Sequence, residues 1–284
     1  MKRTLTGEQF RYLWREAGGD VVKRPLQVLG SARTRSESAS RTAELAAWWR
    51  YRPDPAALSA VRILRRPELW LEATTVDAAG RPLRGLVGVG AAYSTLVLQD
   101  PVPEPPGRAA EPGIGGARPA WSRERGGDCH IETGRVGGLV ARLCAGLPHH
   151  PAGGGTVLTA ALAAVAPGAP GGAGAPLSER ATRSDPERIR SLGERPRRFE
   201  AHFQVTAPTG VAGERARAGL IWLVGDDGGH VFDGDGIGRS AGSAPAGAPG
   251  RTVRVRPCGR GALEAAVRSL LAGALEQSDR AGRD

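Results

Sequence analysis

The segment from Phe199 to Asp233 constrains the fold more than any other part of the sequence. Apolar residues stand at every second position of 199–205, which is the period of a half-buried strand. A turn at 208–210 leads into a continuous apolar run at 218–224, and a second turn at 226–229 leads into a third short run. The pattern predicts an antiparallel meander whose first strand is half-exposed and whose second strand is covered on both faces.

A strand and a long helix follow this meander, and the same series of elements occurs earlier in the chain. Segment 252–256 alternates apolar and basic residues, and an amphipathic helix is predicted from about Gly261 to Gln277. An equivalent series has strands at 69–76, 83–91, 95–98 and 129–132 and a helix at 134–147. The apolar residues of the two helices correspond in order: Leu139, Leu143 and Leu147 in the first and Leu263, Val267 and Leu271 in the second.

Two copies of a unit of three strands, a long loop, a strand and a helix define the expected fold class. The sequence predicts an α+β protein with a quasi-two-fold duplicated central antiparallel sheet, flanked by helical bundles. We expect residues 1–284 to form a single domain made of two related halves, approximately 1–150 and 151–284. A chain of 284 residues is long enough to bury a substantial core.

Two helices before the first copy have clear N-terminal signals. Thr6 and Gln9 form a capping box, in which each side chain accepts a hydrogen bond from a backbone N–H at the helix start. Asp54 and Pro55 are the N-cap and the first-turn residue of a later helix. The expected apolar stripe of that later helix consists of Ala57, Val61 and Leu64.

A further helix is expected between these two, from about Ser36 to Tyr51. Its spacing predicts that Ala43 and Ala47 are buried, together with one of the adjacent residues Trp48 and Trp49. Neighbouring helical residues point about 100° apart, so the two tryptophans are not expected in one core. The second tryptophan is then free to face a loop or a partner.

The region between the two copies contains insertions with little core of their own. Thr156–Val165 is compatible with helix or strand, and we expect helix for most of it. Pro167–Pro176 reads as a Gly/Pro/Ala linker, and Leu177–Leu192 carries helical signals that include a cap at Ser184. These insertions must pack on the sheet or on another molecule.

The formal charge of +10 raises the question of nucleic-acid binding. Lysine occurs only at Lys2 and Lys23 and asparagine is absent, while Arg, Gly, Ala and Pro are abundant, which is typical of a GC-rich coding sequence. The arginines are spread along the chain except for one cluster, expected to be exposed: Arg188, Arg190, Arg195, Arg197 and Arg198. We therefore interpret the charge as a solvated basic surface and do not expect nucleic acid as a partner.

The expected location is the cytoplasm. The first residues lack the apolar run of a signal peptide, and the most apolar stretch, 157–165, is too short to span a bilayer. Three scattered cysteines, Cys129, Cys144 and Cys258, do not form a disulfide framework and agree with a reducing compartment.

The sequence Gly238–Gly242 matches a nucleophile elbow with Ser240 as the nucleophile. That motif requires a helix directly after it, and the following segment, 243–250, is rich in Pro and Gly. No histidine follows His230, so the expected order of triad residues cannot be completed. A serine hydrolase is therefore disfavoured.

The remaining candidate sites for metals and cofactors also fail. A calcium loop starting at Asp233 would need a ligand at Ile237 and a glutamate at Ala244. Cys129 and His130 are neighbours on a strand and point to opposite faces, so the cysteine is expected in the core and the histidine on the surface. His149–His150 lies in a loop without a partner motif. We expect no metal, no cofactor and no enzymatic activity.

Several short motifs, taken in order, resemble the EspG family of type VII (ESX) secretion-associated proteins, and the resemblance covers nearly the whole chain. The motifs are Leu5–Phe10 with Leu13–Trp14, Pro25–Leu26 before a Ser/Thr/Glu/Arg-rich helix, Leu64–Glu68, Gly127–Asp128, Leu147–Pro148, and Ile221–Leu223 with Asp226–Gly228. The order and spacing of the set carry the resemblance.

The resemblance implies a cytosolic, non-enzymatic chaperone that covers the apolar tip of helical PE–PPE-like heterodimers and keeps them soluble for export. The family's contact surface uses the helical bundle of the C-terminal half and a sheet loop. By position, the corresponding elements are the loop 100–127 and the helical insertions that contain Leu158, Leu162, Leu177, Ile189 and Leu192. For each of these five residues, packing against the sheet is the alternative to partner contact.

Two other hypotheses are a basic nucleic-acid-binding or regulatory protein and a hydrolase that uses Ser240. Duplex binding that weakens steeply with salt would favour the first. Loss of activity in a Ser240→Ala variant would favour the second. The sequence leaves open the cognate substrate, the oligomeric state, a homodimer included, and whether loops 100–127 and 234–250 order on binding.

Overall fold

The computed structural model describes residues 1–28, 30, 32–77, 81–101, 126–165, 184–208, 215–234 and 251–281. The chain divides into two compact units, Met1–Leu143 and Cys144–Asp284. Each unit contains antiparallel strands and helices, so the expected α+β class is confirmed. That residues 1–284 form a single domain of two related halves stays a prediction.

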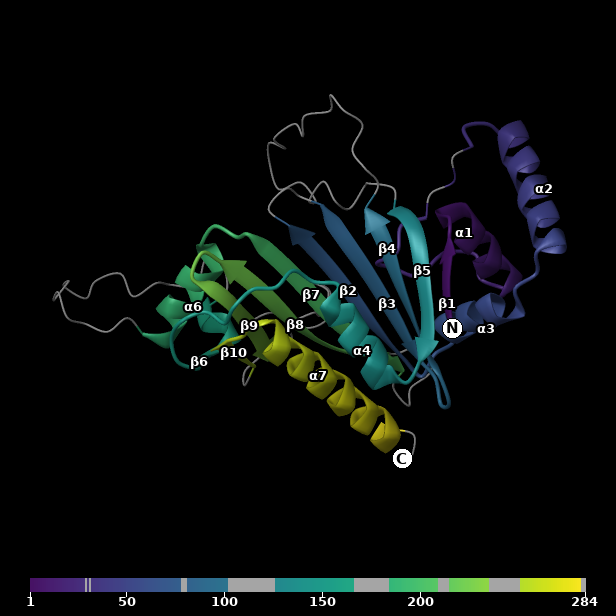
Figure 1. Cartoon of the computed structure of the whole chain (residues 1–284). Helices are drawn as coiled ribbons and strands as arrows, with labels where there is room; N and C mark the ends of the chain where they lie inside the picture. The colour runs from purple at the N-terminus through teal and green to yellow at the C-terminus, as the bar shows by residue number, and fades with distance from the viewer. Residues whose placement is uncertain are drawn as a thin grey trace, which may run out of the picture. The chain divides into compact units, whose positions relative to one another are not determined.

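The sheet of the first unit has the strand order β1-β5-β4-β3-β2, and all its pairs are antiparallel (Figure 1). Its strands are β1 (Lys2–Leu5), β2 (Leu69–Asp77), β3 (Pro82–Val89), β4 (Ser94–Pro101) and β5 (Gly126–Gly134). The meander β2-β3-β4 and the later strand β5 agree with the sequence prediction. The sequence did not predict β1.

Two helices cover one face of this sheet. The helices of the first unit are α1 (Gly7–Glu16), α2 (Arg35–Tyr51), α3 (Pro55–Arg65) and α4 (Val136–Ala145). Phe10, Leu13 and Trp14 of α1 and the predicted stripe of α3 form a core with apolar residues of the strands. On the opposite face, Leu143 of α4 lies against Gly85, where a Cβ atom would be 2.6 Å from its Cδ1.

The helix α2 packs mainly on α1 and buries no residue completely (Figure 1). Its predicted bounds are confirmed, and Thr34 and Glu37 close a capping box at its start. The prediction that Ala43 and Ala47 are buried is wrong: α2 contacts the described part of the unit mainly through α1, which leaves Ala43 exposed and Ala47 half-buried. The expectation that the two tryptophans would not share one core is also wrong, since Trp48 and Trp49 are both half-buried against it, with ring centroids 5.9 Å apart.

The sheet of the second unit has the order β7-β8-β9-β10-β6. Its strands are β6 (Leu158–Ala161), β7 (Phe199–Pro208), β8 (Arg215–Gly225), β9 (Gly228–Gly234) and β10 (Thr252–Pro257). A three-strand meander is again followed by a fourth strand and a helix, and a four-residue strand pairs with the fourth one. The quasi-two-fold relation between the halves stays a prediction.

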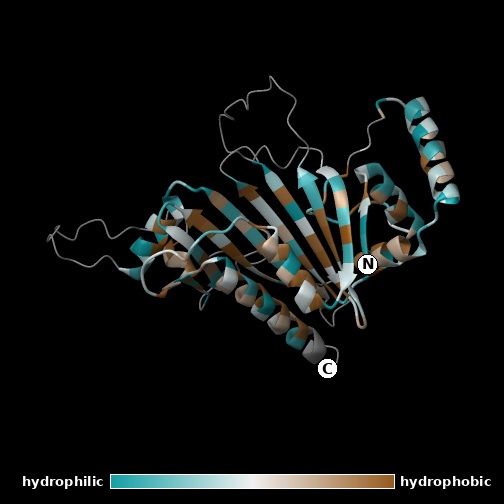
Figure 2. Cartoon of the chain, in the orientation of Figure 1, coloured by the Kyte–Doolittle hydropathy of each residue, from teal (hydrophilic) through white to brown (hydrophobic). Residues whose placement is uncertain are grey.

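Helices lie on both faces of the second sheet. They are α5 (Leu162–Val165), α6 (Asp185–Glu194) and α7 (Arg260–Ala281). The long helix α7 packs on β7 and β8, and α6 packs on β6. Figure 2 shows hydrophobic and hydrophilic residues in alternating bands along the strands.

The expectation of helix for most of Thr156–Val165 is wrong for its central part. Leu158 pairs with Val255 and Ala160 with Val253, so residues 158–161 form a strand, and only 162–165 are helical. Leu158 and Ala160 are buried whereas Thr159 and Ala161 are exposed. This alternation matches a strand, and pairing with β10 outweighs the helix propensity of the alanine-rich sequence.

Candidate partner-binding groove

A groove of about 640 Å³ lies beside α6 in the second unit. Its walls come from α6, from the segment that leads into β6, and from the ends of β9 and β10. The volume is within the range of sites that hold a small apolar group or the tip of a side-chain cluster. The sequence prediction placed a partner-binding surface on these same insertions.

The floor of the groove is apolar. Leu158 and Val255 are 3% and 1% exposed, and Leu192 is half-buried beside them. These residues belong to a core cluster between α6 and the sheet, in which Ile189 is the one buried residue of α6. A smaller depression next to the groove adds Leu223 and Phe232 to the apolar surface.

The rim of the groove consists of charged residues that form ion pairs with one another. Nη1 of Arg195 is 2.5 Å from Oδ2 of Asp227, which joins the end of α6 to the β8–β9 turn. Arg188 and Asp185 form a longer pair of 3.7 Å, and Asp185 also accepts a hydrogen bond from the backbone N–H of Thr159. An apolar floor with a paired polar rim suits an apolar group that enters from solvent.

One end of the groove depends on glycine. Nε2 of His230 lies 3.1 Å from the backbone oxygen of Gly154. A Cβ atom on the preceding residue, Gly153, would be 2.1 Å from the His230 ring, so no larger residue fits there without movement. Gly155 has φ +107°, a left-handed conformation that glycine adopts without strain. Glycine at 153 and 155 therefore allows this segment to lie against His230 and to adopt its backbone conformation.

The structure gives the five predicted contact residues different positions. Leu158 and Ile189 are buried, and Leu162 and Leu192 are half-buried at the edge of the same cluster. Leu177 lies outside the described residues, as do all but the ends of the loop 100–127. The four described residues are thus brought together on one side of the second sheet.

The polar members of the groove were not singled out from the sequence as site residues. Arg188 and Arg195 were noted only as members of a basic cluster, and Asp227 only as part of a turn. No periodicity in the sequence joins a helix terminus to a turn 32 positions later. The pairing of Arg195 with Asp227 depends on how α6 returns to the sheet.

The basic cluster is largely neutralised where it meets β7 and β8. Arg195 pairs with Asp227, Arg197 with Glu200, and Arg198 with Asp226. A surface that binds a nucleic-acid backbone needs cations that are free to contact phosphates. The ion pairs therefore argue against using this cluster for nucleic acid.

Cys129 and His130 have the positions expected from the sequence, the cysteine in the core and the histidine on the surface. Cys129 is fully buried, and burial raises the pKa of its thiol to about 12, which leaves it unreactive. His130 is exposed, with Nδ1 at 3.0 Å from Thr4 Oγ1 and Nε2 at 2.7 Å from Asp100 Oδ2. These bonds join β1, β5 and β4 at an exposed position of the sheet.

The described ranges contain no cluster of metal ligands and no membrane-spanning helix. Within them, no group of three His, Cys, Asp or Glu side chains could hold a metal ion. None of the described helices is long and apolar enough to cross a membrane. Ser240 lies outside these ranges, so the hydrolase hypothesis is not tested here.

Known proteins share both the fold and the family-level sequence pattern of this chain. No curated protein sequence matches significantly, whereas fourteen chains of solved structures do. One is the Mycobacterium tuberculosis type VII secretion system chaperone EspG5, solved in complex with a PE25–PPE41 dimer. It has a TM-score of 0.58 and 9% identity over 95% of this chain and 96% of that one, which shows a shared fold. The model of the EspG family matches residues 6–269. The chain therefore belongs to the EspG family.

Proposed function

We propose that this protein is a cytoplasmic chaperone of type VII secretion. It binds the apolar tip of helical PE–PPE-like substrates and keeps them soluble for export. The observation that carries the proposal is membership of the EspG family over residues 6–269. The similar fold of EspG5, whose structure contains a PE25–PPE41 dimer, supports the same class of partner.

The groove beside α6 is the proposed docking surface within the second unit. Its apolar floor would receive side chains from the tip of a helical hairpin, and burial there removes surface that otherwise drives aggregation. Each apolar side chain that becomes fully buried contributes about 1.5–3 kcal/mol before ordering costs. The paired rim of Arg195 and Asp227 borders this floor.

The predicted contact residues divide into two roles in this proposal. Leu162 and Leu192 are half-buried and keep surface for a partner. Leu158 and Ile189 are buried, so they hold the floor in place. Leu177 and most of the loop 100–127 lie outside the described residues, and their contact with a partner stays a prediction.

The proposal includes no catalytic chemistry. The three cysteines are buried, and burial raises the pKa of Cys144 to about 12 and of Cys258 to about 11, as it does for Cys129. Such thiols stay protonated at neutral pH and make poor nucleophiles. A binding role requires shape and apolar area instead, which the groove supplies.

Co-expression with a PE–PPE-type pair tests the function directly. We expect the pair to be insoluble alone and to elute with the chaperone as one complex in size-exclusion chromatography. If candidate pairs encoded near this protein are neither solubilised nor co-eluted, the proposal is wrong.

A Leu192→Glu variant tests the groove. It places a charge on the half-buried floor, and we expect binding at least about 30-fold weaker, the scale of an interface hot spot. Val21→Glu is the matched control, since Val21 is an exposed apolar residue of the first unit. Unchanged circular dichroism of both variants separates lost binding from lost folding. Equal client affinity of the two variants would exclude the groove but not the function.

A further inference from the structure

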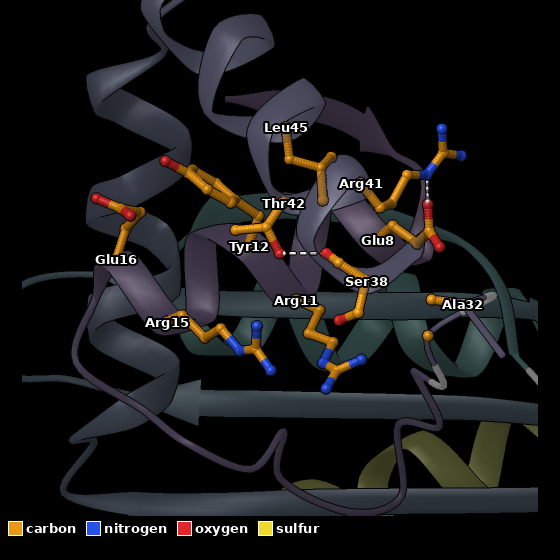
Figure 3. A pocket seen from close by; sticks show the side chains of 11 residues that line it. Glu8, Arg11, Tyr12, Arg15, Glu16, Ala32, Ser38, Arg41, Thr42 and Leu45 are labelled. Carbon is orange, nitrogen blue, oxygen red and sulfur yellow. Dashed lines mark hydrogen bonds and ion pairs between the residues drawn. The ribbon is translucent and has the colours of Figure 1, made fainter. Parts of the chain in front are cut away.

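A second pocket, between α1 and α2 in the first unit, has no role in the proposed function. Its volume is about 170 Å³, and its lining includes Arg11, Arg15, Tyr12 and Leu45 (Figure 3). It is lined by residues of α1, of α2 and of the segment that joins the two helices. The pocket is large enough for a small polar ligand but not for a helix.

Arg11 and Arg15 are the unusual members of this lining. They lie one helical turn apart on α1, so their side chains share a face. Figure 3 shows both guanidinium groups directed to the same side of α1. Among the described residues, neither guanidinium forms an ion pair or a hydrogen bond. Two neighbouring unpaired cations repel each other unless an anion lies between them.

The acidic residues of the pocket are engaged elsewhere. Oε2 of Glu8 is 2.6 Å from Nε of Arg41, and Nη1 of Arg41 is 2.6 Å from Glu44. Glu16 lies beside Tyr12, away from the two arginines (Figure 3). Burial, followed by a hydrogen bond with Glu16, raises the pKa of Tyr12, so its hydroxyl stays protonated.

A glycine leaves room for one of the two guanidinium groups. A Cβ atom on Gly30 would lie 2.7 Å from Nη1 of Arg11, closer than atoms approach without displacement. Any other residue at position 30 would push the guanidinium out of its present position. The local chain therefore accommodates the Arg11 head group at the pocket wall.

We propose that this pocket binds the phosphoryl group of a phosphate monoester between Arg11 and Arg15. A dianion matches the two positive charges, and planar guanidinium groups bind phosphate oxygens in a bidentate manner. The ring of Tyr12 and the side chain of Leu45 offer apolar walls for the organic part of the ester. The phosphate site lies within the first unit, whereas the groove beside α6 lies within the second.

Titration of the full chain with inorganic phosphate at low salt tests the proposal by calorimetry. We expect saturable binding in the millimolar range, weakened as salt screens the charges. Arg11→Gln and Arg15→Gln should each weaken binding at least about tenfold, the effect of losing one charge-assisted contact. Both residues lie outside the buried stripe of α1, which consists of Phe10, Leu13 and Trp14, so thermal stability should be retained. Arg62→Gln is the matched control, because Arg62 is exposed on α3, outside the pocket.

Further ligands test which anions the pocket prefers, and one more variant tests the role of Gly30. Acetate, a monoanion, should bind more weakly than phosphate, and Gly30→Ala should reduce phosphate affinity by displacing Arg11. O-phosphoserine and glycerol 3-phosphate distinguish a phosphopeptide-like source from a lipid-headgroup-like source of the same group. Absence of saturable phosphate binding, or equal binding by wild type and both arginine variants, would overturn the proposal. Client co-elution is measured in parallel, since its loss would bear on the groove and not on this pocket.

Discussion

Substitution of Ile189 by alanine should release α6 from the sheet. Ile189 is 3% exposed and is the one fully buried residue of this helix. A helix of 10 residues has little stability in water by itself, so tertiary contacts must hold it. The apolar contact between Ile189 and the cluster on β6, β8, β9 and β10 is the main such contact.

The expected cost follows from the size of the deleted side chain. Replacing a buried isoleucine by alanine costs about 2–5 kcal/mol, depending on how far the site collapses. If this loss falls on the docking of α6, the amides of the helix should exchange about 30 to 5,000 times faster, at about 1.4 kcal/mol per factor of ten. The amides of β7 and β8 should keep their protection, because α7 covers those strands.

Hydrogen exchange measured by mass spectrometry can separate these regions. The matched control is Leu192→Ala, which removes a half-buried side chain from the same helix and should accelerate exchange much less. The reasoning would be refuted if Ile189→Ala left α6 protected while it lowered the stability of the whole second unit. That result would mean that α6 unfolds only together with the sheet. Detachment of α6 alone, and with it movement of the groove wall that α6 forms, would then be excluded.

Three further predictions concern the core and its titratable groups. Trp222→Phe should cost about 1–3 kcal/mol in urea unfolding, because its buried Nε1–H donates to the backbone oxygen of Cys258 at 2.7 Å; an unchanged midpoint would contradict this. A thiol reagent at pH 8 should modify no cysteine of the native protein and all three after unfolding. The reason is that Cys129, Cys144 and Cys258 are buried, which raises the pKa of each thiol. Rapid labelling of the native protein would contradict this prediction. Hydrogen bonding to His202 lowers the pKa of Glu200 from its usual 4.5 to about 2. Its carboxylate therefore stabilises the fold above pH 4.5 and loses this contribution as the pH falls towards 2. In a Glu200→Gln variant, the free energy of unfolding, measured by circular dichroism, should depend less on pH over that interval.

Alternation and capping in the sequence were sufficient to predict most elements. The meander around Phe203 and Trp222 needs no knowledge of its neighbours, because apolar residues at period two define the buried face. The capping box at Thr6 and the N-cap at Asp54 locate the starts of α1 and α3. These signals are local, and the structure contains the corresponding elements.

Elements that depend on a distant partner were not predictable in this way. The strand β1 has one buried residue, Leu5, and exists because it pairs with β5 more than 120 positions later. Ala43 is exposed because, among the described elements, α2 contacts mainly α1. The groove has the same origin, since the contact of Arg195 with Asp227 follows from the path of the chain after α6.

The short strands β1 and β6 bear on whether the edges of the two sheets can recruit strands from another chain. Each is four residues long and is the outermost strand of its own unit on one side. Lys2 and Arg3 place charge on the first, and α5 begins directly after the second. Long, flat and uncharged edges recruit further strands, whereas short or charged edges do not. A protein that accumulates with adhesive clients, as proposed here, can thus be concentrated without templating cross-β growth.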